Sequence, residues 1–135
     1  MIENRSMPPG SVIPQLAYDD VREAAEWLCR AFAFRERLRI GDHRIQLHVG
    51  EGSVVVTDHG PRGGSVMVRV EDADAHRERA EREGAQIVMP PTDFPFGERQ
   101  YTAEDLAGHR WTFSQSIADV DPSDWGGTVV ELENS

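Results

Sequence analysis

The sequence predicts an α+β fold in which two tandem βαβββ modules form a cupped, eight-stranded mixed sheet. The order strand, helix, three strands occurs twice, with a period of roughly 50 residues. Both occurrences begin alike, with LAYDDVREA and VRVEDADAH, in which acidic residues follow a strand and open a helix. A repeated order of elements over nearly the whole chain is stronger evidence for a fold than any single motif.

The first module is expected over residues 11–60. Its first strand covers residues 12–18, and Asp19 or Asp20 caps a helix that runs to about Phe32, because apolar residues recur there at helical spacing. Glycine-containing turns separate three short strands, which are expected over residues 34–40, 43–49 and 53–57.

The second module is expected over residues 61–116, with a strand at 64–70 and a helix from Asp72 to Gly84. A short strand at 86–89 and a Pro-rich loop then lead to a closing hairpin. The hairpin strands cover residues 98–103 and 109–115, and the turn between them is Asp105 to Gly108.

The two ends of the chain are expected to lie outside the modules. Residues 1–10 form a flexible N-terminal arm, and residues 117–135 form an acidic C-terminal tail. In the tail, Asp121 and Pro122 can open a helical turn. Trp125 is expected to pack on the body or on a partner subunit, and residues 128–132 are a candidate edge strand.

Composition limits the possible partners. The chain has 135 residues, the size of one compact domain, and a net charge of −10 from 24 acidic and 14 basic residues. Nucleic acid and anionic membranes bind clusters of Lys and Arg, so this balance argues against both. The single cysteine, Cys29, excludes an internal disulfide and favours a cytoplasmic location. No apolar run reaches transmembrane length, and residues 1–10 lack a signal core.

The closing hairpin, FGERQYTAEDLAGHRWTF, resembles that of the vicinal oxygen chelate superfamily, which includes glyoxalases, bleomycin-resistance proteins and extradiol dioxygenases. The family pattern is an aromatic residue, then Asp-Pro-x-Gly-His/Asn, then an aromatic strand, and here Leu106 replaces the proline. The resemblance implies a ligand cup and a homodimer. Residues that line the cup then decide between metal chemistry and simple binding.

Strand alternation assigns side chains to the concave face of the cup. Val66, Val68 and Val70 should pack under a helix, which leaves Met67 and Arg69 on the concave face. If Asp105 pairs with Gly108 across the turn, Arg99 and Tyr101 share the face of Thr112. Phe94 and Phe96 lie on the Pro-rich loop, where they are expected to form an aromatic lid or to stack on a planar ligand. The candidate ligand-binding residues are Gln15, Met67, Arg69, Phe94, Phe96, Arg99, Tyr101 and Thr112.

Metal-dependent members of the superfamily use His, Glu or Gln on the first, fourth, fifth and eighth strands. The resemblance places these positions near Ile13, Val55, Ser65 and Thr112, none of which is a good ligand for a divalent ion. A shift of two places brings in only Gln15. We therefore expect no metal cofactor. An improvised divalent-metal site stays open as an alternative, with candidate ligands His48, His59, Glu98 and Glu104.

Two functions from different classes stay open. The first is a metal-independent binding protein that, like antibiotic-sequestering members of the superfamily, holds a drug or secondary metabolite in a cup at a homodimer interface. The acidic surface suits a cationic ligand, whereas Arg69 and Arg99 suit an anionic group. The second is a metal-dependent lyase, isomerase or dioxygenase with a rearranged site. The missing metal ligands favour the first.

Overall fold

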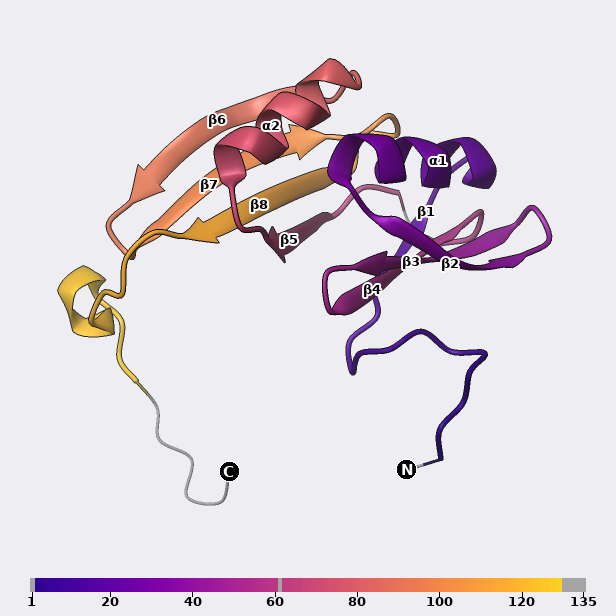
Figure 1. Ribbon diagram of the computed structural model, residues 1–135, viewed down its shortest axis with the longest axis horizontal. Coiled ribbons are helices and arrows are strands. Elements are labelled where there is room, and N and C mark those ends of the chain that lie inside the picture. Colours follow the sequence, from indigo (N-terminus) through magenta and orange to yellow (C-terminus); the bar gives the residue numbers. More distant parts are fainter. Residues whose placement is uncertain (1, 61, 130–135) are drawn as a thin grey trace.

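The computed structural model describes residues 2–60 and 62–129 (Figure 1). The first module contains β1 (Gln15–Ala17), α1 (Val21–Phe32), β2 (Arg35–Ile40), β3 (Arg44–Val49) and β4 (Gly52–Thr57). The second contains β5 (Ser65–Arg69), α2 (Ala73–Arg82), β6 (Gln86–Phe94), β7 (Glu98–Glu104) and β8 (Arg110–Ser116). A 3-10 helix, η1 (Pro122–Trp125), follows in the tail. The duplicated βαβββ order is confirmed.

The predicted fold class is confirmed, and its eight strands are divided between two four-stranded mixed sheets. Their strand orders are β1-β4-β3-β2 and β5-β8-β7-β6. In each module the first strand runs parallel to the last, and the remaining neighbours are antiparallel. Helices α1 and α2 lie on the same side of the molecule and contact each other (Figure 1). The opposite faces of the sheets curve into the concave side.

Both helices begin at expected aspartates, and of the two candidates for α1 the cap is Asp20. The side chain of Asp20 accepts a hydrogen bond from the backbone N–H of Glu23, and that of Asp72 accepts one from Ala75, each at 3.0 Å. Helix α1 ends where Ala33 adopts a left-handed backbone with φ of 65°. In residues 2–60 and 62–129, no helix is long and apolar enough to cross a membrane.

Aromatic side chains from both modules meet under the helices. The ring centre of Phe32, at the end of α1, lies 4.8 Å from that of Phe113 and 5.6 Å from that of Trp111. All three are fully buried. His76 of α2 donates from Nε2 to the carbonyl of Phe32 at 3.0 Å, which leaves Nδ1 to accept from the Tyr101 hydroxyl. The modules therefore share one core on the helix side.

A buried carboxylate organises the turn between β7 and β8. Oδ2 of Asp105 accepts hydrogen bonds from the Tyr18 hydroxyl at 2.5 Å and from Nε1 of Trp111 at 3.0 Å. Oδ1 accepts from the backbone N–H groups of Ala107 and His109, each at 3.0 Å. Burial, followed by the negative charge of Asp105, raises the pKa of Tyr18, so its hydroxyl stays protonated.

The register of the closing hairpin differs by one residue from the prediction. The N–H of Asp105 donates to the carbonyl of His109 at 3.0 Å, so the turn is one residue longer than expected. Tyr101 consequently pairs with Phe113 and is fully buried on the helix side. The expectation that Tyr101 and Arg99 face the concave side is therefore wrong.

Strand β6 extends through most of the segment that was predicted to be a Pro-rich loop. It continues past Met89 and includes Pro90 and Pro91, with two irregularities in its pairing to β7. β6 is an edge strand, so a proline that lacks an N–H donor removes no hydrogen bond from a second neighbour. β1 is shorter than expected, because only Gln15–Ala17 are in strand conformation.

The tail folds back onto the end of the β6–β7 hairpin. The N–H groups of Ile117 and Ala118 donate to the carbonyl of Gly97 at 2.8 and 3.3 Å. Asp121 caps η1 as expected, and the ring of Trp125 lies 5.2 Å from that of Phe96. Of the two expected partners for Trp125, the body supplies this contact, although the side chain stays 47% exposed, and the candidate edge strand at 128–132 lies mostly outside the described residues.

We expect Asp105→Ala to lower the free energy of unfolding by about 3 kcal/mol, because the Tyr18 and Trp111 donors would stay buried without an acceptor. Urea denaturation followed by tryptophan fluorescence measures this loss. The matched variant Tyr18→Phe removes one donor and keeps the other, so it should lose about 1 kcal/mol. Equal losses in the two variants would contradict this role of Asp105.

Stability should fall as the pH drops below the ordinary His pKa of about 6.5. Burial lowers the pKa of folded His76, so in the window between the two values the unfolded chain binds a proton that the folded chain does not. Denaturation of His76→Gln between pH 7.5 and 5.5 should show a shallower pH dependence than the parent. The exposed His43→Gln variant is the control, and an unchanged slope in His76→Gln would refute the assignment.

Candidate functional site

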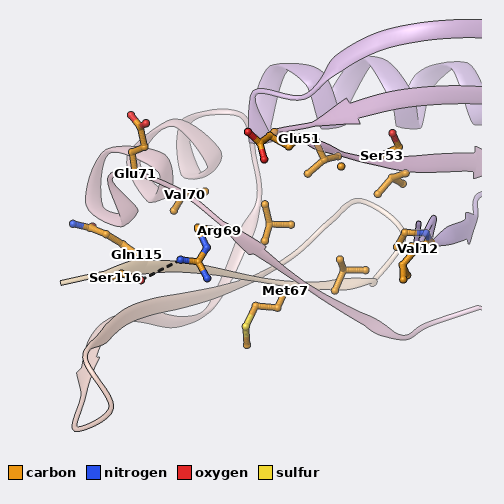
Figure 2. A pocket seen from close by; sticks show the side chains of 16 residues that line it. Val12, Glu51, Ser53, Met67, Arg69, Val70, Glu71, Gln115 and Ser116 are labelled. Atoms are coloured by element: carbon orange, nitrogen blue, oxygen red, sulfur yellow. Dashed lines mark hydrogen bonds between the residues drawn. The ribbon is translucent and has the colours of Figure 1, made fainter. Parts of the chain in front are cut away.

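A cleft of about 860 Å³ lies between the two modules, along β5 (Figure 2). The β3–β4 turn forms one wall, with Glu51 and Ser53, and β5 and the end of β8 form the other, with Met67, Arg69 and Ser116. Its volume is within the range of pockets that hold small organic ligands. The apolar part of the lining consists of Val12, Pro14, Val49, Val54, Val66, Val68 and Val70.

One guanidinium and the carboxylates of Glu51 and Glu71 lie among the valines of this cleft. Arg69 points toward Ser116, and its Nη1 lies 3.4 Å from the Ser116 hydroxyl, which is a weak contact (Figure 2). In the described part of the chain, no carboxylate lies within ion-pair distance of Arg69. Hydrogen bonds from Ser114 and Ser116, followed by the charge of Arg69, lower the pKa of Glu98. Arg69 is thus available to an anionic or acceptor group.

The structure brings two predicted site residues together in the cleft and places two others elsewhere on the concave faces. Met67 and Arg69 line the cleft, and Val66 and Val68, which alternate with them along β5, are partly buried against the core and also border the cleft. Gln15 accepts a hydrogen bond from Arg44 of β3, on the far side of β4, at 3.3 Å, and Thr112 bonds to the paired threonine of β7 at 2.8 Å. These two side chains lie outside the cleft lining.

Phe94 and Phe96 form an aromatic cluster with the tail. Their rings are stacked at a centre-to-centre distance of 5.3 Å, and Phe96 also contacts Trp125 at 5.2 Å. All three are partly accessible to solvent, and none belongs to the cleft lining. In this structure the cluster fastens η1 to the β6–β7 hairpin.

Arg99 and Tyr101 face α2. Nε of Arg99 donates to Asp93 at 2.7 Å and Nη1 donates to Asp74 at 3.1 Å. The hydrogen bond to Asp93 raises the pKa of Arg99, and burial raises the pKa of Tyr101, so both keep their protons. These two side chains are engaged in packing and ion pairs on the face opposite the cup.

Sequence reasoning missed the wall formed by the β3–β4 turn. Strand alternation assigns faces inside strands, but it does not say which turn approaches which strand. The turn glycines at 50 and 52 are the available signal, because a turn without bulky side chains allows another segment to approach. Strand alternation also missed Gln115, at the end of β8, because its place in the cleft lining depends on the register of the β7–β8 hairpin.

The residues present do not fit the divalent metal that some superfamily members use. Gln15 pairs with Val55 across β1 and β4, and Met67 pairs with Thr112 across β5 and β8, so the central positions offer no set of imidazole and carboxylate donors. Among residues 2–60 and 62–129, no three His, Cys, Asp or Glu side chains form a group that could hold a metal ion. The improvised site with His48, His59 and Glu98 is therefore not assembled.

The thiol of Cys29 is half-buried on α1, away from the cleft. Burial, followed by the charge of Glu36, raises its pKa, so the thiolate that would act as a nucleophile or metal ligand is disfavoured. This environment favours an unreactive, structural cysteine.

A model of the Glyoxalase/Bleomycin resistance protein/Dioxygenase superfamily matches residues 12–113, which is more than half of the chain. The chain therefore belongs to this superfamily. The match spans both modules and ends within β8, so it covers the cleft lining except Gln115 and Ser116.

Two solved structures are similar in fold, and a curated relative is similar in sequence. TioX from Micromonospora sp. ML1 is 37% identical, with a TM-score of 0.70 over 81% of this chain and 100% of TioX. TnmS3, described as an antibiotic binding protein from Streptomyces sp. CB03234, shares the fold at 22% identity, with a TM-score of 0.66 over 77% of this chain and 93% of TnmS3. The uncharacterized protein Rv0887c of Mycobacterium tuberculosis is 27% identical over 127 residues, covering 79% and 75% of the two chains.

Proposed function

We propose that this protein is a metal-independent binding protein that sequesters a drug or secondary metabolite in the cleft between its modules. The observation that carries the proposal is the cleft of about 860 Å³, which combines valine and methionine side chains with the guanidinium of Arg69 and the carboxylates of Glu51 and Glu71. Such a site offers burial, shape and one strong hydrogen-bond donor, which is what a ligand pocket needs. It offers no nucleophile next to a base, and no donor set for a metal is found among the described residues.

The chemistry of the lining suggests which ligands are suitable. Valine and methionine side chains favour an apolar or aromatic body, Arg69 favours an anionic or hydrogen-bond-accepting substituent, and Glu51 and Glu71 favour a cationic or hydrogen-bond-donating one. The net charge of −10 would speed the approach of a cationic ligand, but contacts inside the cleft outweigh this long-range effect in affinity. The description of TnmS3 as an antibiotic binding protein supports the same class of function.

We also infer that the cup is completed in a homodimer. Val12 and Met67 line the cleft, and yet they are 81% and 64% exposed, which is unusual for apolar side chains at a binding site. A second copy of the chain would cover them and enclose the ligand. The single cysteine supports a cytoplasmic location for this assembly.

A ligand of this class should raise Tm in the presence of EDTA. At a free concentration of 100 times Kd the stabilisation is about 2.7 kcal/mol, which corresponds to roughly 10 °C for a chain of this size. Differential scanning fluorimetry against a panel of antibiotics and aromatic acids measures the shift. Loss of every shift on removal of divalent ions, with recovery on adding them back, would reject metal independence.

Arg69→Gln should weaken the ligand found in this way by about 10- to 100-fold, because a hydrogen bond to a charged donor contributes about 1.5–3 kcal/mol. Titration calorimetry measures the change. Arg22→Gln removes the same charge from α1, where Arg22 lies near Asp42, and should leave affinity unchanged. Equal affinities for all three proteins would show that Arg69 does not contact the ligand.

Sedimentation equilibrium should give twice the mass of the chain, or about twice 15.1 kDa. Met67→Glu places a charge where the partner would cover an apolar side chain, so it should shift the equilibrium toward monomer. Leu106→Glu, at an exposed turn residue away from the cleft, is the matched control. A parent protein that stays monomeric at 100 times its assay concentration would exclude the dimeric cup.

A further inference from the structure

The N-terminal arm lies against the concave face of the first sheet. Three side chains on β2, β3 and β4 donate hydrogen bonds to its backbone carbonyls: Arg37 to Arg5 at 2.9 Å, Gln46 to Ser6 at 2.9 Å, and Ser53 to Pro9 at 2.8 Å. Figure 1 shows the arm on the side of the sheet opposite α1. The contacts come from three neighbouring strands, so they cover the width of the sheet rather than one edge.

Two of the three residues that hold the arm are buried. Gln46 and Ser53 are 3% and 4% exposed, and Pro8 of the arm is itself buried. Gln46 pairs with Val55, which pairs in turn with Gln15, so these side chains share the face that the fold leaves for a ligand. Buried polar side chains are normally hydrogen-bonded, so those in the middle of a concave face need a partner from the protein, from water or from a ligand. Here the chain itself provides the partner.

The donors on this face recognise oxygen atoms and make little use of arm side chains. Each bond ends at a main-chain carbonyl, and Nη1 of Arg37 also donates to the side-chain oxygen of Gln46 at 2.6 Å, which fixes the orientation of both groups. An amide, a guanidinium and a hydroxyl are thus arranged for acceptor oxygens. A small molecule with carbonyl, carboxylate or sulfonate oxygens presents the same chemistry.

The covered face is continuous with the cleft. Ser53 holds Pro9 of the arm and also lines the cleft, and a Cβ on Gly10 would lie 4.0 Å from Cα of Gly52 in the same turn. The arm therefore passes along the wall formed by the β3–β4 turn. Removing it would extend the cleft across β4 toward β3 and β2.

We propose that the concave face of β2, β3 and β4 is a second half of the ligand site, specific for acceptor oxygens, and that residues 5–9 occupy it until a ligand displaces them. This inference rests on the proposed binding function and adds its specificity residues, Arg37, Gln46 and Ser53. Because the arm competes from within the chain, the apparent Kd equals the intrinsic Kd divided by the fraction of molecules with the arm released.

Trypsin reports directly on arm docking, because cleavage after Arg5 requires the Arg5 carbonyl to leave Arg37. The full chain is treated briefly, and intact-mass spectrometry follows the product that begins at Ser6. Pro8→Asp places a carboxylate at the buried position and should speed this cleavage about tenfold or more. Ile2→Asp adds the same charge to the arm at a 92% exposed position and should cleave at the parent rate.

1-Anilinonaphthalene-8-sulfonate tests whether the released face binds a ligand, because it joins an aromatic body to acceptor oxygens. We expect its fluorescence titration to give an affinity about tenfold higher for Pro8→Asp than for the parent or Ile2→Asp. Saturating dye should also speed cleavage after Arg5 in the parent. Pro8→Gly, which removes the buried ring and adds no charge, should change both readouts in the same direction but less.

Each outcome decides the proposal. Equal cleavage after Arg5 in parent and Pro8→Asp would show that the arm is not docked. Faster cleavage with unchanged dye affinity, or with no dye binding to any variant, would show that the arm covers a face that takes no ligand. Dye binding that leaves cleavage of the parent unchanged would overturn displacement. Arm protection needs no natural ligand, so a failed antibiotic panel would count against the proposed function alone.

Discussion

The buried carboxylate of Asp105 holds the closing hairpin against the first module, and the cleft depends on that contact. Tyr18, which follows β1, and Trp111 of β8 donate to the same carboxylate oxygen, and beside them Nε2 of His109 donates to the carbonyl of Ala17 at 2.8 Å. A charge removed from water is stable only while its hydrogen bonds are satisfied. The modules are therefore fixed at one separation, which sets the width of the cleft.

The shared aromatic core determines what is left for binding. Phe32, Trp111, Phe113 and His76 are gathered on the helix side, so large apolar side chains are concentrated there. Strand alternation then leaves smaller aliphatic and polar side chains on the concave side. Without donors for a metal at the central positions, affinity on this side has to come from burial, shape and hydrogen bonds.

Local signals in the sequence were sufficient for the element order and part of the site. Asp72 and the pair Asp19 and Asp20 identified both helix starts, and the alternation of β5 predicted the exposed positions of Arg69 and Met67. The positions of Arg99 and Tyr101 depend on a turn that is one residue longer than expected, which reverses every side chain of β7. Likewise, prolines inside β6 are tolerated because topology puts that strand at an edge, which no local pattern reveals.

The energetics of the arm explain how a covering segment can yield to a ligand. Three hydrogen bonds contribute about 3 kcal/mol and the buried ring of Pro8 adds about 1–2 kcal/mol. Ordering five backbone residues opposes docking by about 5 kcal/mol or slightly more. These contributions nearly cancel, so docked and released arms are close in free energy, and a small preference of a ligand for the open face shifts the population. A segment held by side-chain donors is suited to such exchange, whereas a strand added to the sheet ladder would gain more hydrogen bonds and be harder to displace.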